Sequence, residues 1–320
     1  MKLTIVNDNF FYKLTDGLLA KIRDAAPGIE ITIADLRTAT AADLNDPEIV
    51  YGRVPVHALG ELHNLKWIHL GSSGSNGLND ISLYPDPDII LTKSSGTFGI
   101  PIAEHIIGMM LTLGRNFYHC FDKQREGTWS PVWSDYHEIY DSVVLVLGLG
   151  DIGTEVCRRL SGFGCRIIGF RKDHTVPHKL VSDVRPLSRL RESLPEADYI
   201  VLCLPGTAKT DKLIGHKEFA LMKSNAMVIN VGRGMVIDTD ALIEALDTKK
   251  IAGAGLDVTE PEPLPAGHPL WTAPNVFITP HVSAGSQRTE ERRVDIFVDL
   301  LKRYIAGEEM YNRVNFDEGY

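Results

Sequence analysis

The chain has 320 residues, of which 44% are hydrophobic and 23% are charged. This composition excludes a disordered or low-complexity protein, and the length favours two domains over one. The net charge of −9 gives no general attraction to phosphate backbones or anionic lipid. We therefore expect neither nucleic acid nor a membrane surface as a partner.

The start of the chain, MKLTIV, leads directly into a strand pattern without a basic n-region or a cleavage site. No apolar stretch approaches the ~20 residues of a membrane span, so we expect a cytoplasmic protein. The cysteines form no CxxC pair and lie among apolar neighbours. We predict reduced, buried thiols and no metal site. These cysteines are Cys120, Cys157, Cys165 and Cys203.

In chain order, the first elements alternate between strands and helices. KLTIV predicts a strand, residues 11–26 predict a helix, and EITIAD and LKWIHL predict two further strands. Strands that alternate with helices form a parallel sheet covered on both faces. After them, Pro101 opens IPIAEHIIGMMLTLGRNFYHCFDKQREG, whose apolar spacing predicts one long helix of about five turns.

A second series of strands begins at Val143 with VVLVLGLG and continues with CRIIGF, DYIVLCLP, AMVINVG, AGAGLDV and NVFITP. Six strand candidates separated by loops and helices predict a doubly wound sheet. A final helix is predicted from Ser286 to about Ala306, and its pattern alone would fit either half of the chain.

The sequence GLGDIG follows the first strand of this second series and opens a helix. Gly148 permits a tight turn, Gly150 lets the backbone approach a pyrophosphate, and Gly153 lets helix and strand pack closely. The helix N-terminus then offers amide donors to the phosphates. We predict a dinucleotide site here.

The end of the next strand distinguishes the two nicotinamide dinucleotides, because an acidic residue there accepts hydrogen bonds from the ribose of NAD. Arg171 occupies that place, with Lys172 beside it. A guanidinium suits a 2′-phosphate and cannot accept a hydrogen bond from a ribose hydroxyl. NADP(H) is therefore preferred over NAD(H). The alternative is that Asp173 contacts the ribose of NAD.

Reactive side chains follow three later strands, at the sheet edge where open α/β sheets bind ligands. Arg233 lies in VINVGRG, Glu262 in GLDVTEPEPL and His281 in VFITPHVSAGS. A guanidinium, a carboxylate and an imidazole together can bind a 2-oxo acid and protonate its carbonyl.

With these motifs in this order, the chain resembles the D-isomer-specific 2-hydroxyacid dehydrogenases. GLGDIG, VLCLPGTAKT, MK followed by INVGRG, GLDVTEPEPL and TPH carry the resemblance over most of residues 60–315. It implies that Arg233 holds the substrate carboxylate and carbonyl oxygen and that His281 is the general acid and base. Glu262, five residues after Asp257, would hydrogen-bond the imidazole and keep it protonated nearer neutral pH.

The resemblance also implies further binding residues. The substrate carboxylate would lie against backbone amides of Ser73, Gly74 and Ser75 in GSSGSNG. Around the dinucleotide the implied residues are Asp151 and Ile152 at the pyrophosphate, Pro205 and Thr210 along the adenosine, Val231 at the nucleotide and Asp257 near the nicotinamide amide.

The domain order follows from the same resemblance. Residues 1–98 and 287–320 would form a flavodoxin-like substrate domain, into which a Rossmann domain of residues 99–286 is inserted. We expect a homodimer, with Trp129 or Trp133 reaching toward the partner subunit's site.

A small 2-oxo acid such as glyoxylate or hydroxypyruvate is the expected substrate. Formate dehydrogenases share the fold but have glutamine in place of the glutamate, so Glu262 argues against that activity. The remaining alternative is an interaction protein, similar to the related transcriptional corepressors, that senses the dinucleotide without significant turnover.

Overall fold

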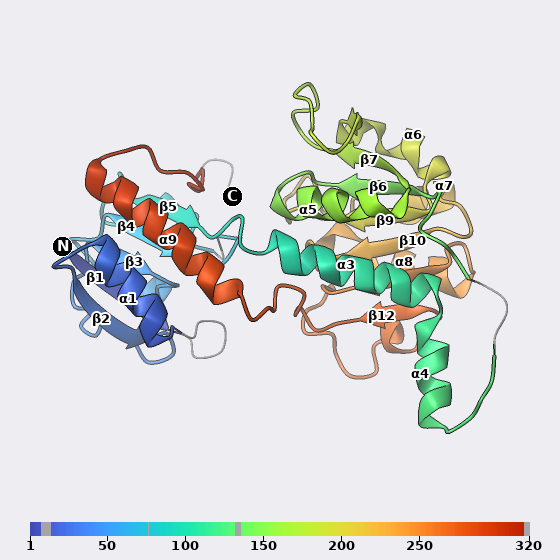
Figure 1. Ribbon diagram of the computed structural model, residues 1–320, viewed down its shortest axis with the longest axis horizontal. Coiled ribbons are helices and arrows are strands. Elements are labelled where there is room, and N and C mark those ends of the chain that lie inside the picture. Colours follow the sequence, from blue (N-terminus) through green and yellow to red (C-terminus); the bar gives the residue numbers. More distant parts are fainter. Residues whose placement is uncertain (8–13, 76, 132–135, 317–320) are drawn as a thin grey trace. The chain divides into compact units, whose positions relative to one another are not determined.

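The computed structural model describes residues 1–7, 14–75, 77–131 and 136–316. The chain divides into two compact units (Figure 1). Unit 1 consists of Met1–Phe98 and Ser286–Tyr320, and unit 2 consists of Gly99–Gly285.

Unit 1 contains a parallel sheet with the strand order β2-β1-β3-β4-β5. This order reverses direction between β1 and β3, as in flavodoxin-like folds. The strands are β1 (Lys2–Asn7), β2 (Glu30–Asp35), β3 (Ile49–Tyr51), β4 (Trp67–Leu70) and β5 (Ile90–Lys93). The α-helices are α1 (Asp16–Ala25), α2 (Val56–Leu59) and α9 (Thr289–Ala306).

Alternation along β1 sends side chains to both faces of this sheet. Leu3 and Ile5 join a core cluster with Ile22 of α1 and Phe297 of α9, whereas Val6 joins the cluster on the opposite face. Helices α1 and α9 lie side by side over the first face (Figure 1). The last helix therefore belongs to the N-terminal sheet, which it covers although it is distant in sequence.

Unit 2 contains a parallel sheet with the order β12-β11-β10-β9-β6-β7-β8. Its direction reverses between β6 and β9, and the crevice at such a point binds ligands in doubly wound sheets. The strands are β6 (Val143–Leu147), β7 (Arg166–Phe170), β8 (Asp183–Arg185), β9 (Tyr199–Leu202), β10 (Met227–Asn230), β11 (Gly253–Leu256) and β12 (Val276–Ile278).

Helices cover both faces of this second sheet. Helix α3 packs on α5 and on β10 to β12, while α7 and α8 join the core cluster of the other face. The α-helices are α3 (Gly99–Gly114), α4 (Phe117–Arg125), α5 (Asp151–Leu160), α6 (Leu190–Ser193), α7 (His216–Leu221) and α8 (Thr239–Asp247). The two doubly wound sheets predicted from the sequence are confirmed, and so are the six predicted strands of the second series.

Two predicted helices have different bounds. Of the helix predicted over residues 11–26, residues 11–13 lie outside the described residues, and α1 begins at Asp16, where the Thr15 hydroxyl caps it by accepting a bond from the Leu18 amide. The long helix predicted after Pro101 is wrong as one element. It ends at Gly114, whose carbonyl accepts a bond from the His137 amide, and Asn116 then takes a left-handed φ of 51° before α4.

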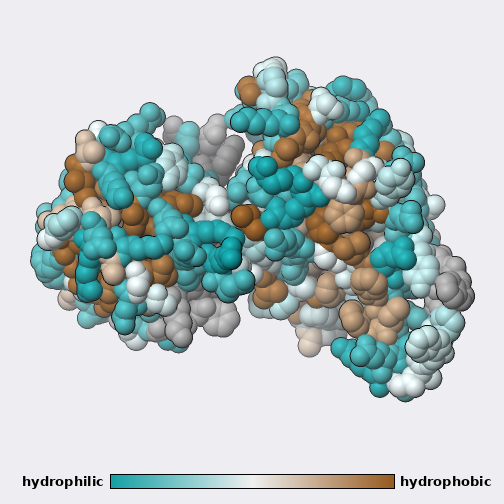
Figure 2. Space-filling model, viewed as in Figure 1, coloured by the Kyte–Doolittle hydropathy of each residue, from teal (hydrophilic) through white to brown (hydrophobic). Residues whose placement is uncertain are grey.

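The cysteine prediction holds in part. All four thiols are free, and burial raises the pKa of Cys157 to about 12 and also raises the pKa values of Cys165 and Cys203. Cys157 is buried and Cys165 and Cys203 are half-buried, but Cys120 is exposed on α4, so the prediction of burial is wrong for Cys120. Its neighbours Phe117 and Phe121 are also exposed, and Figure 2 shows apolar atoms among hydrophilic ones over this helix. In the described ranges no helix is both long and apolar enough to cross a membrane.

Candidate active site

The turn after β6 has the geometry predicted for a dinucleotide site. Gly148 has a φ of +101°, and a Cβ there would meet the Cys203 carbonyl oxygen at 2.7 Å. A Cβ on Gly153 would lie 1.9 Å from the Gly148 oxygen, whereas one on Gly150 would meet no atom within 4 Å. The backbone is therefore closely packed at the first and third glycines and open at the second, where a phosphate needs access.

Helix α5 begins directly after this turn, so its first amides point toward the switch point of the sheet. Asp151 and Ile152 are its first two residues. The Asp151 Oδ2 atom accepts a 3.0 Å bond from the Gly99 amide, which ties the start of α3 to the dinucleotide turn.

Arg171 is the first residue after β7. One of its terminal nitrogens donates to the Val176 carbonyl, while its buried Nε has no hydrogen-bond partner among the described residues. The Asp173 carboxylate accepts two bonds from Thr175, which lower its pKa. The acidic alternative for ribose binding is thus engaged in its own turn, whereas the arginine keeps an unused donor.

A histidine that the sequence analysis did not single out joins this loop to α5. His178 Nδ1 accepts from the Leu180 amide, so Nε2 is the protonated nitrogen and donates to Thr154 Oγ1 at 3.2 Å. Burial, followed by the Arg171 charge, lowers the pKa of His178. A neutral imidazole therefore fixes the loop that carries Arg171.

The loop after β9 contains Pro205 and Thr210. The Thr210 hydroxyl is buried and donates to the Pro205 carbonyl at 2.7 Å, so this side chain shapes the loop. Val231, directly after β10, is 5% exposed and donates its amide to the Leu202 carbonyl. These residues place backbone at the switch point next to the glycine turn.

Arg233 lies in a turn fixed by a buried asparagine. Asn230 Oδ1 accepts from the Gly232 amide and its Nδ2 donates to the Arg233 carbonyl, both at 3.0 Å. A Cβ on Gly234 would lie 2.0 Å from the Thr259 carbonyl oxygen, so this turn packs against the loop that leads to Glu262. The Arg233 side chain is exposed, and Nη1 donates to the Gly232 carbonyl.

Glu262 and His281 form a pair, with 2.5 Å between Oε1 and Nδ1. Their side chains are 40% and 48% exposed, so the pair faces solvent. Because Nδ1 contacts the carboxylate, Nε2 is the nitrogen available to a ligand. The structure brings these two predicted residues together, and backbone packing joins their loops to the Arg233 turn.

Beneath this pair lies Asp257, which is 1% exposed. Its carboxylate accepts bonds from the amides of Val282 and Ser283 and from the Thr279 hydroxyl. Its carbonyl accepts from the His281 amide at 2.9 Å. Asp257 therefore holds residues 279–283, which we call the His281 turn.

In unit 1, residues 71–75, here called the serine loop, follow β4. The Ser72 hydroxyl donates to the Gly74 carbonyl, and the Ser75 carbonyl accepts from the Leu78 amide. Ser73 is exposed. The predicted residues Ser73, Gly74 and Ser75 thus lie at the carboxyl end of a parallel strand, as the ligand rule for such sheets requires.

A second residue missed from the sequence lies beneath the serine loop. His69 is fully buried, and its Nδ1 and Nε2 lie 2.9 Å from Thr92 Oγ1 and 3.0 Å from Ser94 Oγ. Burial lowers its pKa from 6.5 to about 3, so the imidazole is neutral at neutral pH. A single histidine in an apolar strand gives no sequence signal for such a network.

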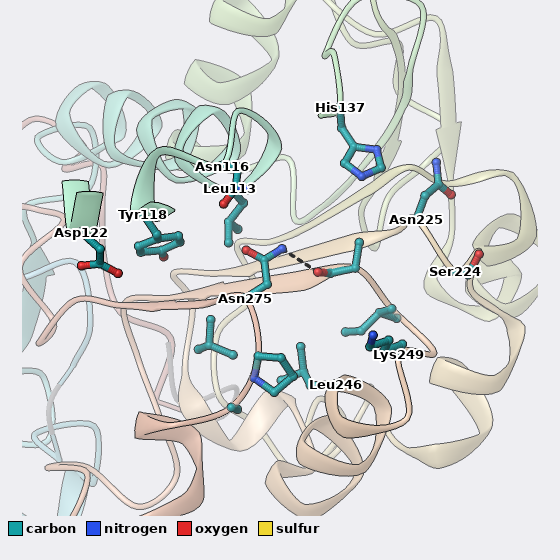
Figure 3. Close-up of a pocket in the computed structure, with 15 residues that line it drawn as sticks. Leu113, Asn116, Tyr118, Asp122, His137, Ser224, Asn225, Leu246, Lys249 and Asn275 are labelled. Atoms are coloured by element: carbon teal, nitrogen blue, oxygen red, sulfur yellow. Dashed lines mark hydrogen bonds between the residues drawn. The ribbon is translucent and has the colours of Figure 1, made fainter. Parts of the chain in front are cut away.

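A cavity of about 690 Å³ in unit 2 lies away from these loops (Figure 3). Leu113 and Asn116 approach it from the end of α3, and Asn275, just before β12, donates to the Ala252 carbonyl at 2.6 Å. This cavity is at the edge where the strands begin, opposite the edge that binds ligands in doubly wound sheets. We do not assign the active site to it.

Comparison with known proteins gives a family for this arrangement. Residues 107–283 match the family described as D-isomer specific 2-hydroxyacid dehydrogenase, NAD binding domain. The D-3-phosphoglycerate dehydrogenase of Methanocaldococcus jannaschii is 31% identical over 301 residues, which are 92% of this chain and 57% of that protein. This chain therefore spans little more than half the length of that relative.

Two further relatives match with different coverage. The glyoxylate reductase of Korarchaeum cryptofilum is 33% identical over 235 residues, covering 71% of this chain and 69% of the relative. A D-isomer specific 2-hydroxyacid dehydrogenase from Xanthobacter autotrophicus Py2, solved in complex with NADPH and MES, is 27% identical. It superposes with a TM-score of 0.81 over 99% of each chain.

Proposed function

Because this chain belongs to the D-isomer specific 2-hydroxyacid dehydrogenase family, we propose that it reduces a small 2-oxo acid to a D-2-hydroxy acid with a nicotinamide dinucleotide. Membership of this family supports an oxidoreductase, since the matching family model describes the NAD binding domain of such dehydrogenases. The observation that carries the proposal is the contact between His281 and Glu262. It lies on the same unit and at the same sheet edge as the glycine turn.

In this proposal His281 Nε2 donates a proton to the carbonyl oxygen of the substrate while the carbonyl carbon accepts a hydride. Glu262 accepts the bond from Nδ1, which orients the ring and stabilises the imidazolium. Arg233 holds the substrate carboxylate and carbonyl oxygen through its planar guanidinium. For the serine loop of unit 1, the proposal is that the backbone amides of Ser73, Gly74 and Ser75 bind a carboxylate.

The residues around the glycine turn fit a dinucleotide. The open space at Gly150 and the amides that begin α5 suit a pyrophosphate. The loops with Pro205, Thr210 and Val231 would flank the adenosine side, and Asp257 Oδ2 would accept from the nicotinamide amide. When bound, the reduced cofactor supplies the hydride.

We further propose that NADP(H) is preferred over NAD(H). The support is Arg171, whose buried Nε has no partner among the described residues, with Lys172 next to it. A 2′-phosphate would accept a hydrogen bond from that donor and pair with the charge of the guanidinium. The ribose hydroxyl of NAD carries no charge and does not require an arginine. The arginine therefore selects for the phosphorylated dinucleotide.

The first test is initial rates with NADPH and NADH against glyoxylate, hydroxypyruvate, pyruvate, phenylpyruvate and 2-ketoisocaproate. We expect turnover with NADPH preferred over NADH. The 2-oxo acid with the highest kcat/KM then indicates which substrate side chain the pocket accommodates. Arg171→Ala should raise the KM for NADPH about tenfold while leaving that for NADH within about twofold. Equal effects on both cofactors would contradict the role of Arg171.

The catalytic assignment has its own test. His281→Ala should lower kcat by about 10²–10⁴-fold. Glu262→Gln should lower kcat by less, because the imidazole can still donate its proton but loses the carboxylate that orients it. Arg233→Ala should mainly raise the KM for the 2-oxo acid. His268→Ala is the matched control, since that histidine only caps a short turn. Unchanged turnover in all three site variants would refute the mechanism.

We also propose a homodimer formed through unit 2. Phe117 and Phe121 of α4 and Trp129 after it are exposed, with Phe121 at 53% and Trp129 at 99%, and such apolar surface favours a protein contact. Trp129 would contact the partner subunit, whereas Trp133 lies outside the described residues. Sedimentation of the wild type and of Phe121→Ser/Trp129→Ser should show a dimer and a monomer respectively.

A further inference from the structure

The His281 turn has a conformation that its own residues do not favour. His281 has a φ of +53°, in the left-handed region that a side chain with a Cβ rarely adopts. Its amide donates to the carbonyls of Asp257 and Thr279. Since an imidazole that transfers a proton must be held in place, the contacts that enforce this conformation bear on the chemistry.

The Asp257 carboxylate supplies most of those contacts. Oδ1 accepts from the Val282 amide at 2.9 Å, and Oδ2 accepts from the Ser283 amide at 3.1 Å. A buried carboxylate of this kind is stable only while its donors surround it. The orientation of the carboxylate and the shape of the turn therefore depend on each other.

The third donor to this carboxylate is the Thr279 hydroxyl, at 2.6 Å from Oδ1. A hydroxyl has one proton, and here it is donated to a group that can only accept. The Thr279 oxygen must then accept from His105 Nε2, which lies 3.0 Å away. The direction of the whole chain is fixed, from the imidazole through the hydroxyl to the carboxylate.

His105 connects this chain to the long helix α3. Its side chain is 23% exposed, and burial lowers its pKa, with the Asp257 charge acting in the opposite direction. The helix packs on β11 and β12, the strands that precede Asp257 and Thr279. His105 is thus a neutral donor presented by a rigid element.

From this geometry we propose that Thr279 and His105 are positioning residues for the proposed reaction. They orient the Asp257 carboxylate so that it holds the His281 turn in its left-handed conformation. The expected effect on turnover rests on the proposed function. The hydrogen-bond chain from His105 through Thr279 to Asp257, here called the Asp257 clamp, does not depend on it.

The test compares variants that remove or keep each donor. Thr279→Val removes the hydroxyl and Thr279→Ser keeps it, while His105→Phe removes the N–H and His105→Gln keeps one. Thr248→Val is the matched control, because that hydroxyl donates only to the Glu244 carbonyl on an exposed helix end. Amide hydrogen exchange of the peptide over residues 277–285 and steady-state kinetics are measured for each.

We expect Thr279→Val to speed exchange at His281, Val282 and Ser283 about tenfold and to lower kcat about tenfold, with both KM values within about twofold. His105→Phe should give about threefold effects. Thr279→Ser, His105→Gln and Thr248→Val should resemble the wild type. If Thr279→Val fails to fold, the comparison of His105→Phe with His105→Gln tests the proposal instead.

Three results would refute the positioning role of Thr279 and His105. They are wild-type amide exchange rates in Thr279→Val and His105→Phe, equal losses of kcat in Thr279→Val and Thr279→Ser, or changes in KM without a change in kcat. A wild-type enzyme that reduces no 2-oxo acid would refute the proposed function instead. In that case the amide exchange rates over residues 277–285 still test whether Thr279 and His105 hold the His281 turn.

Discussion

In both units a polar side chain is buried at the carboxyl end of the strand next to one edge of the sheet. Asp257 follows β11 in unit 2, and His69 lies near the end of β4 in unit 1. Each bonds to the neighbouring edge: Asp257 to the Thr279 hydroxyl after β12, and His69 to the Thr92 hydroxyl on β5. Each also lies beneath a loop whose residues we propose to act on a ligand.

The two differ in what surrounds them. Asp257 is surrounded by donors, two of them backbone amides of the turn that it holds. His69 contacts hydroxyls on both ring nitrogens and packs among aromatic rings, so it is neutral. The comparison indicates that a carboxylate holds the His281 turn of unit 2. In unit 1 an uncharged hydrogen-bond network around His69 lies beneath the serine loop, and protonation of His69 at low pH would destabilise it.

Asp257→Asn should have the largest effect. The new amide group would point N–H donors at the amide or hydroxyl donors of the turn, leaving buried donors unpaired. We expect kcat to fall about 100-fold and the free energy of unfolding of unit 2 to fall by about 2–3 kcal/mol. Kinetics and urea unfolding measure both, with the exposed Asp247→Asn as control. A fully active variant would show that the carboxylate does not hold the turn.

Lowering the pH should destabilise unit 1 next most strongly. The pKa of His69 is 6.5 when unfolded and about 3 when folded, so the unfolded state binds more protons between these values. The stability from the neutral imidazole is complete above pH 6.5 and declines as the pH falls toward 3. From pH 7 to pH 5 we expect a loss of about 2 kcal/mol in the free energy of unfolding.

His69→Gln isolates this contribution, because glutamine offers a donor and an acceptor but does not titrate. Urea unfolding of unit 1 at several pH values should give a difference between wild type and variant that shrinks as the pH falls. A difference that is independent of pH would mean that His69 does not titrate on unfolding.

Thr92→Val should destabilise unit 1 by about 1–2 kcal/mol, since it leaves the Trp67 indole N–H and one His69 nitrogen without their partner. Thr92→Ser should restore most of the loss. Thr32→Val on β2 is the control, because among the described residues its hydroxyl accepts a single bond, of 3.3 Å, from Asn45. Urea unfolding followed by tryptophan fluorescence makes the comparison, and equal losses for Thr92→Val and Thr92→Ser would contradict it.

Much of this arrangement was predictable from the sequence because it depends on local patterns. The glycine turn, six of the seven strands of unit 2 and the family follow from motifs in a fixed order, and all three are confirmed. The family resemblance also implies the pairing of Glu262 with His281, whose side chains are in contact. The break at Asn116 was missed because it depends on a bond to His137, which is distant in the chain.

The buried networks were not predictable for a similar reason. His69 lies on β4, whereas Thr92 and Ser94 lie on β5 and directly after it, and His105 is far in sequence from Thr279, so no local spacing reveals that they meet. Strand β8 was missed because its three residues, DVR, have no apolar periodicity. Sequence patterns specify the elements and motifs, while packing decides which polar side chains support them.

Ser94→Ala tests whether the unit 1 network acts on substrate binding. The Ser94 hydroxyl accepts from His69 and donates to the Leu70 carbonyl at 2.9 Å, and its amide bonds to the Ser72 carbonyl. Losing the hydroxyl loosens the base of the serine loop, so we expect the KM for the 2-oxo acid to rise about threefold with kcat unchanged. Ser82→Ala is the control, because that exposed hydroxyl donates to Asp80 and to no other group in the part of the chain that the structure describes. Because Asp257→Asn acts on kcat, a fall in kcat for Ser94→Ala would instead place both networks on the same step and remove the distinction between the units.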